Sequence, residues 1–204
     1  MITKLKQKIQ QTLTIPAKTA HKIGLTPNKI TAIGIALAFL SALAFTQWQN
    51  HRFYLLLAAA LLLLSGFCDA LDGVIARLYQ QTTAFGSFLD SLLDRYADAV
   101  IYATIISAGL CEPQWGLAAL IGSIVVSYSR AKAEADNIKM ESVGIAERAE
   151  RIIILSITTI TAIYWLSALN IGIIILAILS NLTVLQRSLH VYKILKKTEI
   201  KEKH

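Results

Sequence analysis

The chain has 204 residues, of which 55% are hydrophobic and only 16% are charged. A soluble domain usually carries about a quarter charged residues, so this composition disfavours a soluble protein and favours an integral membrane protein. The net charge is +7 at pH 7. The two cysteines, Cys68 and Cys111, are too few and too isolated for a disulfide framework or a zinc site, and we expect them to be apolar packing residues.

Residues 1–25 form a segment of their own. Leu5, Ile9 and Leu13 recur at helical spacing among lysines and glutamines, and the pattern ends at Pro16. This arrangement predicts a short amphipathic helix that lies on the membrane surface beside the first span. A frayed basic tail is the alternative.

Residues 26–204 carry six apolar segments and are expected to form one helical domain. About 20 residues are needed to cross a bilayer, and several segments reach this length only if their helices continue into polar sequence on one side. We therefore predict an all-α integral membrane protein with six transmembrane helices that protrude on that side. The segments are Ile30–Thr46, Leu55–Leu71, Ala97–Leu110, Gly116–Tyr128, Ile152–Leu166 and Ile171–Leu185.

The distribution of basic residues supports an even number of spans. Six spans place residues 1–29, 72–96, 129–151 and 186–204 on one side of the membrane. These stretches hold 6, 2, 5 and 6 Lys or Arg, which is 19 of the 20, and Arg52 alone lies on the other side. Because basic loops stay in the cytoplasm, we expect both termini there.

Aromatic residues mark the opposite face. Trp48, Trp115 and Trp165 lie in or beside the three short outer turns, where an aromatic belt is expected. The basic inner face suits anionic lipid headgroups and phosphorylated substrates. A nucleic-acid site would need aromatic residues interleaved with the basic ones, so we expect no nucleic-acid partner.

Four aspartates lie where the second and third segments meet the inner face. Asp69 and Asp72 end the second segment, and Asp90 and Asp94 precede the third, so each pair shares a helix face. We expect the two consecutive helices to be adjacent and antiparallel, which would bring the four carboxylates together. Intramembrane acids are costly and usually functional, and divalent cations would balance their charge. Oxygen ligands suit Mg²⁺, Mn²⁺ or Ca²⁺ rather than zinc, and we expect two Mg²⁺ or Mn²⁺ ions. The alternative is a set of solvated helix ends; Asp98, one turn deeper, would either support the site or be a buried hydrogen-bonded acid.

The residues between the two acidic pairs favour a phosphate ligand. Only Arg77 and Arg95 are near the acids in sequence, which leaves two negative charges without a basic neighbour. Gly73, Ala76 and Gly86 are small enough to let a ligand or backbone approach closely. The planar guanidinium of Arg77 suits phosphate oxygens. Together these residues predict a diphosphate site and phosphoryl-group transfer.

The whole stretch matches the signature of a known family. Residues 69–94 read D-A-L-D-G-V-I-A-R-L-Y-Q-Q-T-T-A-F-G-S-F-L-D-S-L-L-D. They resemble, without departure, the signature of the CDP-alcohol phosphatidyltransferases, D-x2-D-G-x2-A-R-x8-G-x3-D-x3-D. The six-helix membrane topology of that family agrees with the charge distribution, so the resemblance covers nearly the whole chain. Homodimers are usual in the family.

The resemblance implies roles for individual residues. Asp69, Asp72 and Asp90 would be metal ligands, and Asp94 would contact metal and act as general base on the acceptor hydroxyl. Asn28 and Thr31, at the start of the first span, would contact the nucleotide or diphosphate, although their stretch is equally typical of a helix start. The implied CDP-lipid site is Asn28, Thr31, Asp69, Gly73, Ala76, Arg77 and Gly86.

A second basic cluster bears on the acceptor. Residues 127–134 read S-Y-S-R-A-K-A-E and residues 144–151 read G-I-A-E-R-A-E-R, which resembles the inositol-phosphate-using branch of the family. The alternative is a positive-inside loop whose helix ends form salt bridges. The residues expected to bind the acceptor phosphate are Arg130, Lys132, Arg148, Arg151 and Arg187.

The expected protein is thus a multi-pass enzyme of the cell membrane with a cytoplasmic active site. It would transfer an archaetidyl or diacyl phosphatidyl-type group from a CDP-activated lipid to inositol 1-phosphate and release CMP. Glycerol 3-phosphate or another polar alcohol is the alternative acceptor. A non-enzymatic cation carrier would need polar residues through the outer halves of the helices, and a dimerisation scaffold would leave the signature unexplained.

Overall fold

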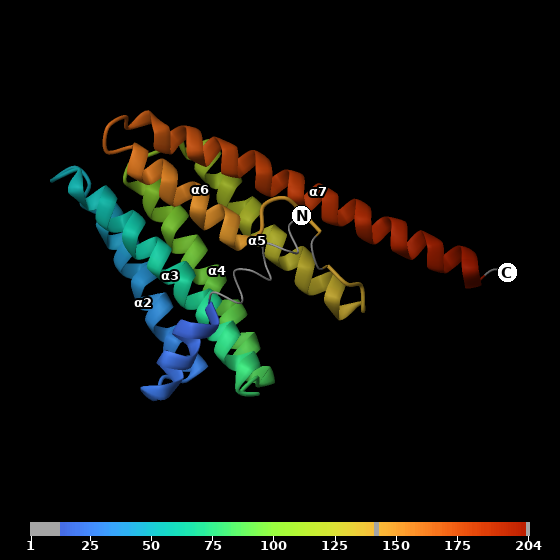
Figure 1. The fold of residues 1–204 in the computed structure, drawn as a ribbon. Helices are drawn as coiled ribbons and strands as arrows, with labels where there is room; N and C mark the ends of the chain where they lie inside the picture. The colour runs from blue at the N-terminus through green and yellow to red at the C-terminus, as the bar shows by residue number, and fades with distance from the viewer. Residues whose placement is uncertain (1–12, 141–142, 203–204) are drawn as a thin grey trace.

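The computed structural model describes residues 13–140 and 143–202, and in this part of the chain helices are joined by turns and loops without any strand (Figure 1). The expected all-α fold is confirmed for these residues. A helix over residues 13–22 comes first. It is followed by α2 (Pro27–Thr46), α3 (Phe53–Leu78), α4 (Ala84–Ser107), α5 (Pro113–Ala135), α6 (Arg148–Thr161) and α7 (Ser167–Glu202).

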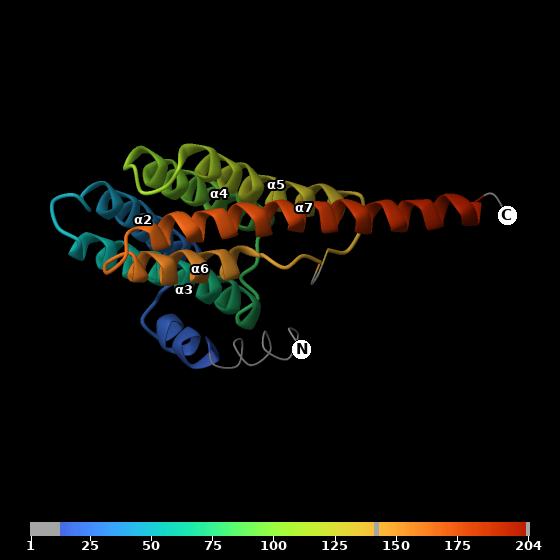
Figure 2. The same cartoon turned by 90° about the horizontal axis from the view of Figure 1, so that it is seen from above.

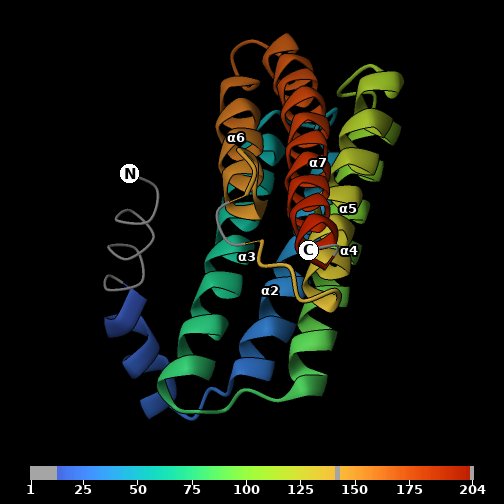
Figure 3. The same cartoon turned by 90° about the vertical axis from the view of Figure 1, so that its right-hand side faces the viewer.

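The helices α2 to α7 close into a ring in which each packs against two others. Around the ring their order is α2, α3, α6, α7, α5 and α4. Figures 2 and 3 show this bundle from above and from the right-hand side of Figure 1. The expected direct packing of the consecutive helices α3 and α4 is not found among the extensive helix contacts of the described residues. Instead, α2 lies between them and packs against both.

Small residues let the helices approach one another closely, as is typical of helix packing in membranes. The hydroxyl of Ser41 on α2 donates a hydrogen bond of 2.8 Å to the carbonyl oxygen of Ala58 on α3. A Cβ atom at Gly122 on α5 would lie only 2.8 Å from the Cβ of Ser180 on α7. Side chains larger than these would force the helix pairs apart.

Large apolar side chains cover the outside of the bundle. Leu43, Ile121 and Ile157 are 61%, 58% and 59% exposed, and they come from three different helices. Water would disfavour so large an apolar surface, whereas lipid tails would cover it. Three helices of the described chain are long and apolar enough to cross a bilayer, which supports a membrane protein. They are Pro27–Thr46, Phe53–Leu78 and Ser167–Lys197.

The helices α4, α5 and α6 carry more charge or are shorter. The helix α6 has 14 residues, which corresponds to about 21 Å. Its expected extension to Leu166 is wrong, because the chain leaves the helix after Thr161. The backbone N–H groups of Tyr164 and Trp165 both donate to the carbonyl oxygen of Thr161 and close a turn. Six spans and cytoplasmic termini therefore stay predictions.

The helix over residues 13–22 continues past Pro16, so the expected helix end at that proline is wrong. Ala17 is fully buried in an apolar cluster with Ile75 of α3, and this packing favours continuation of the helix. The part of the predicted amphipathic helix before residue 13 lies outside the described residues. The helix over residues 13–22 is thus attached to the polar end of α3.

Candidate active site

Acidic side chains from α3 and α4 converge beside α2. Asp69 and Asp72 come from α3, Asp90 and Asp94 come from α4, and all four line one small cavity. One oxygen from each of Asp69, Asp72 and Asp90 lies within 4.8 Å of the other two. The structure therefore brings the four predicted acids together, with Asp94 beside the group of three rather than within it.

The group of three carboxylates fits a hard divalent cation. Its donors are all oxygens, which suit Mg²⁺, Mn²⁺ or Ca²⁺ better than zinc. The Oδ1 atom of Asp90 is buried and has no hydrogen-bond partner among the described residues. A buried oxygen without a partner costs free energy, and a bound cation would supply that partner. Asp69, Asp72 and Asp90 could therefore hold a metal ion.

Helix α2 contributes a hydroxyl that fixes one of these ligands. The Oγ1 atom of Thr31 lies 2.6 Å from Oδ2 of Asp72, and this carboxylate is buried. A hydroxyl carries a single proton, and the short distance indicates that Thr31 donates it to Asp72. Thr31, predicted to contact the nucleotide or diphosphate, thus also orients a carboxylate from the neighbouring helix.

A cavity of about 220 Å³ opens on one side of the acids, and we call it the Gly73 cavity. Every residue predicted for the CDP-lipid site except Asp69 lines this cavity, and Asp90 lines it as well. Gly86 is needed because a Cβ atom there would lie 2.7 Å from Oγ1 of Thr83. The predicted residues that line it are Asn28, Thr31, Asp72, Gly73, Ala76, Arg77 and Gly86.

A second cavity, of about 350 Å³, opens beside Asp69 and Asp94, and we call it the arginine cavity. Side chains of α3 to α7 contribute to it. Five guanidinium groups line it together with five carboxylates, so its lining is rich in charges of both signs; the carboxylates are those of Asp69, Asp94, Asp98, Glu134 and Glu147. The arginines are Arg95, Arg130, Arg148, Arg151 and Arg187.

Lys132 does not line either cavity, although it was predicted to bind the acceptor phosphate with the arginines. Its Nζ atom lies 3.1 Å from Oδ1 of Asp136, one turn further along α5, and both side chains are exposed. The side chain of Lys132 therefore faces solvent rather than the arginine cavity. The spacing of Lys132 and Asp136 in the sequence already allowed this helical ion pair.

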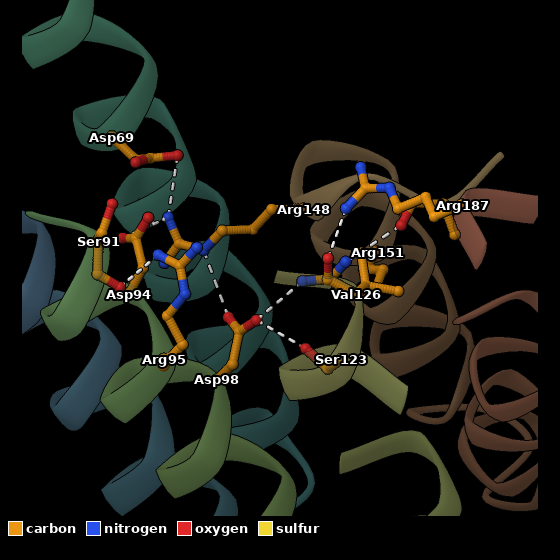
Figure 4. Close-up of polar contacts among 11 residues, drawn as sticks. Asp69, Ser91, Asp94, Arg95, Asp98, Ser123, Val126, Arg148, Arg151 and Arg187 are labelled. Carbon is orange, nitrogen blue, oxygen red and sulfur yellow. Dashed lines mark hydrogen bonds and ion pairs between the residues drawn. The ribbon is translucent and has the colours of Figure 1, made fainter. Parts of the chain in front are cut away.

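Arg148, the first residue of α6, connects the acids of α3 and α4 (Figure 4). Its Nη1 atom lies 2.9 Å from Oδ2 of Asp69 and 2.7 Å from Oδ1 of Asp94, and its Nε atom lies 3.3 Å from Oδ1 of Asp98. Burial lowers the pKa of Arg148, but the three carboxylates outweigh burial and hold the pKa above its ordinary value. The site therefore contains a permanent cation.

Asp98 forms the second contact point of this network. Its Oδ2 atom accepts hydrogen bonds from Oγ of Ser123 at 2.8 Å and from Nη2 of Arg151 at 3.0 Å. Arg151 is almost fully buried, and its Nη1 atom also donates to the carbonyl oxygen of Ala146 at 3.1 Å. Asp98 is thus a partly buried, hydrogen-bonded acid that also supports the site, because it fixes Arg148 and Arg151.

The chain before α6 is fastened to α7. Arg187 is buried, and its Nε atom donates to the carbonyl oxygen of Val143 at 2.9 Å. The backbone N–H of Ala146 donates to Oγ1 of Thr183 at 3.1 Å. Gly144 has a φ of +119°, and a Cβ atom there would lie 2.4 Å from Cγ2 of Thr183. These contacts fix the position at which α6 begins and hence the position of Arg148.

Comparison with known proteins agrees with this geometry. The model of the family described as CDP-alcohol phosphatidyltransferase matches residues 24–185. The chain belongs to this family. Its membership makes the protein an enzyme, so the carrier and scaffold alternatives no longer apply. All signature residues of the CDP-alcohol phosphatidyltransferase line the Gly73 cavity, the arginine cavity or both.

Two similar proteins, one of them in two crystal structures, place the chain more closely within the family. The archaetidylinositol phosphate synthase of Pyrococcus horikoshii is 40% identical over 200 residues, which cover 98% of this chain and 100% of that protein. A crystal structure of Mycobacterium tuberculosis phosphatidylinositol phosphate synthase with manganese and citrate has a TM-score of 0.74 at 29% identity and covers 88% of each chain. The same synthase with CDP-DAG bound has a TM-score of 0.71 at 28% identity, covering 89% of this chain and 94% of that one.

Two residues that support this CDP-alcohol phosphatidyltransferase site, Ser123 and Thr83, were not predicted from the sequence. Ser123 binds Asp98 from the middle of α5, where it looked like an ordinary small residue of an apolar span. Thr83 caps α4 by accepting a hydrogen bond of 3.0 Å from the backbone N–H of Gly86. A threonine three residues before the signature glycine is a typical N-cap signal, which could have identified it.

Replacing Asp98 should destabilise the protein strongly. The change Asp98→Ala leaves the buried guanidinium of Arg151 without its carboxylate, so we expect the free energy of unfolding to fall by about 3–5 kcal/mol. Denaturant unfolding of the detergent-solubilised protein measures this loss. In the control Arg130→Ala, the broken ion pair with Glu134 has side chains 45% and 47% exposed, and the loss should stay below about 1 kcal/mol. Equal losses in the two variants would contradict a supporting role for Asp98.

Proposed function

We propose that this enzyme transfers an archaetidyl or diacyl phosphatidyl-type group from a CDP-activated lipid to inositol 1-phosphate and releases CMP. One observation carries the proposal: the carboxylate cluster borders two different cavities. Asp72 and Asp90 line the Gly73 cavity, whereas Asp69 and Asp94 line the arginine cavity. A donor in the first cavity and an acceptor in the second would meet at the carboxylates.

The Gly73 cavity suits the diphosphate of the donor. Arg77 offers a planar set of N–H donors to phosphate oxygens, and the small residues leave room for the nucleotide. The crystal structure of the mycobacterial synthase with CDP-DAG bound supports a donor of this class. The proposed CDP-lipid site consists of Asn28, Thr31, Asp69, Gly73, Ala76, Arg77 and Gly86.

The arginine cavity suits an acceptor that itself carries a phosphate. Guanidinium groups bind phosphate through paired, charge-assisted hydrogen bonds, and a neutral alcohol would not need several of them. The named functions of the relatives, archaetidylinositol phosphate synthase and phosphatidylinositol phosphate synthase, favour inositol phosphate over glycerol 3-phosphate. The proposed acceptor residues are Arg130, Arg148, Arg151 and Arg187.

The enzyme would use Mg²⁺ or Mn²⁺, as supported by the manganese in the mycobacterial neighbour. Two ions would be held by Asp69, Asp72 and Asp90, with Asp94 as a further metal contact. Bound at these residues, divalent cations would neutralise the donor diphosphate and stabilise the departing phosphate of CMP. Thr31 would keep the carboxylate of Asp72 in place for this role.

Asp94 is the proposed general base. A carboxylate oxygen of Asp94 would take the proton of the acceptor hydroxyl, because an alcohol is a poor nucleophile until it loses that proton. The acceptor oxygen then forms a bond to the lipid-bearing phosphorus of the donor. The bond from this phosphorus to the bridging oxygen breaks, and CMP leaves with that oxygen. The arginines would hold the acceptor phosphate so that its hydroxyl faces Asp94.

We also propose six membrane spans, with both termini and the active site in the cytoplasm. The turns over residues 47–52, 108–112 and 162–166 lie at one end of the bundle, and residues 79–83 and the C-terminal part of α7 lie at the other (Figure 1). Nearly all basic residues lie toward the second end, as cytoplasmic segments do. Residues 26–204 would form one domain and residues 1–25 an amphipathic attachment. A homodimer, as is usual in the family, would appear in light scattering of the detergent-solubilised protein.

Cysteine labelling in intact cells tests the topology. In a background with Cys68→Ser and Cys111→Ser, a cysteine at Gln49 should react with a membrane-impermeant maleimide. A cysteine at Lys197 should react only after the cells are permeabilised, because both positions are exposed but lie on opposite sides in the six-span topology. Labelling of both positions in intact cells would contradict it.

Release of CMP by the purified protein tests the reaction. With CDP-lipid and Mn²⁺ or Mg²⁺, we expect CMP to form only when an acceptor is added, and fastest with inositol 1-phosphate. Unphosphorylated inositol is the matched control, because it lacks only the group that the arginines would bind. Faster reaction with glycerol 3-phosphate than with inositol 1-phosphate would reject the acceptor and keep the chemistry.

The change Asp94→Asn should abolish turnover while CDP-lipid binding persists. An amide cannot take the proton of the acceptor, and loss of a general base typically lowers the rate by about 10² to 10⁴-fold. CMP release and equilibrium binding of CDP-lipid measure the two properties. The control Asp136→Asn makes the same chemical change at an exposed carboxylate outside both cavities and should leave the rate unchanged. Full activity of Asp94→Asn would exclude Asp94 as the base.

A further inference from the structure

The guanidinium group of Arg148 forms ion pairs with carboxylates of both α3 and α4. The Nη1 atom of Arg148 lies 2.9 Å from Asp69 and 2.7 Å from Asp94. The proposed reaction needs Asp69 as a metal ligand and an unhindered carboxylate at Asp94. Arg148 and a divalent cation would therefore compete for the same two negatively charged groups.

The other arginines of the cavity are held by groups that take no part in the proposed reaction. Arg187 donates to the backbone carbonyls of Val143 and Val126. Arg130 pairs with Glu134. These two residues can keep their positions whether or not a substrate is bound.

Two further arginines have equally independent partners. Arg151 donates to the carbonyl of Ala146 and to Asp98, and the guanidinium of Arg95 contacts the carbonyl of Ser91 within the same helix. Of the five arginines that line the arginine cavity, only Arg148 forms ion pairs with Asp69 and Asp94 in the part of the chain that the structure describes.

The arginine cavity offers a second position for the guanidinium of Arg148. Arg148 lines the arginine cavity, and its Nε atom is in contact with Asp98, which lines the same cavity. The contact with Asp98 can persist while the Nη1 atom leaves Asp69 and Asp94. A phosphate in the cavity offers the guanidinium a replacement for the two carboxylates.

We propose that Arg148 is a positioning residue that couples the acceptor site to the metal site, an inference that rests on the proposed metal and acceptor sites. When a phosphate enters the arginine cavity, Arg148 turns toward it and releases Asp69 and Asp94. The freed carboxylates then bind the divalent cation more tightly, and by reciprocity the cation favours binding of the phosphate. The enzyme thus completes its metal site when the acceptor arrives.

Binding of Mn²⁺ to the intact detergent-solubilised protein tests the coupling without turnover. The electron paramagnetic resonance signal of free Mn²⁺ gives the dissociation constant, with and without inositol 1-phosphate. For the wild type, we expect inositol 1-phosphate to tighten Mn²⁺ binding by at least about fivefold, the lower end of typical coupling between sites. Unphosphorylated inositol should have no effect.

The variant Arg148→Gln should bind Mn²⁺ about tenfold more tightly than the wild type without any acceptor, because the competing cation is gone. Inositol 1-phosphate should then cause no further tightening. Lys132→Gln is the matched control: it also removes one positive charge, but the side chain of Lys132 pairs with Asp136, is exposed and lines neither cavity. Its Mn²⁺ affinity should stay within about twofold of the wild type, and its coupling should persist.

The possible results separate this inference from the proposed function. A wild-type protein that binds no Mn²⁺ would overturn the proposed metal site and the inference together. Mn²⁺ binding that is equal in the wild type and Arg148→Gln, or equally tightened in Lys132→Gln, would overturn the inference alone. If Arg148→Gln elutes as aggregate, Arg148→Met decides: its flexible apolar side chain can fill the space but carries no charge to compete with the cation, so Mn²⁺ should bind more tightly than in the wild type. An unchanged affinity of Arg148→Met would then overturn the coupling.

Discussion

Carboxylates that repel one another are held together at the polar end of this bundle, and the surrounding residues are arranged to offset that repulsion. Charges in such a partly buried site interact more strongly than in bulk water. Arg148 offsets the charges of Asp69 and Asp94, and Thr31 offers a hydroxyl to Asp72. Asp90 retains a buried oxygen without a partner in the described structure. The protein thus supplies part of the compensation and leaves the rest to a cation.

The position of α2 allows this arrangement to bind ligands. Because α2 lies between α3 and α4 in the ring, the two acidic helices do not close on each other. Asp72 and Asp90 can then line one cavity while Asp69 and Asp94 line the other. A chain in which α3 and α4 packed directly would hold the same acids but would have no room for a donor and an acceptor on separate sides.

What could be predicted from the sequence depended on how local the determining interaction is. Asp69 and Asp72 share a helix face because of their spacing alone, and the family signature identifies the chemistry. The ion pair of Arg148 with Asp69 could not be predicted, because it depends on how the ring of helices α2 to α7 closes. Lys132 was assigned to the acceptor site from its neighbours in sequence, although it pairs with Asp136 outside the cavity. A resemblance to a family identifies a cluster, but packing decides which of its members face inward.

The length of α3 relates the site to the lipid substrate. Arg52, directly before the helix, carries the only Lys or Arg charge of the predicted outer turns, so it marks the outer boundary of the apolar layer. From Phe53 to Asp69 the helix rises by about 24 Å, against a hydrocarbon core of about 30 Å. In the proposed topology Asp69 would therefore lie just inside the opposite boundary, and the rest of α3, to Leu78, would pass beyond it. At this depth the acyl or isoprenoid chains of a donor could stay in the membrane while its diphosphate reaches the carboxylates, so the proposed reaction would need no extraction of the lipid.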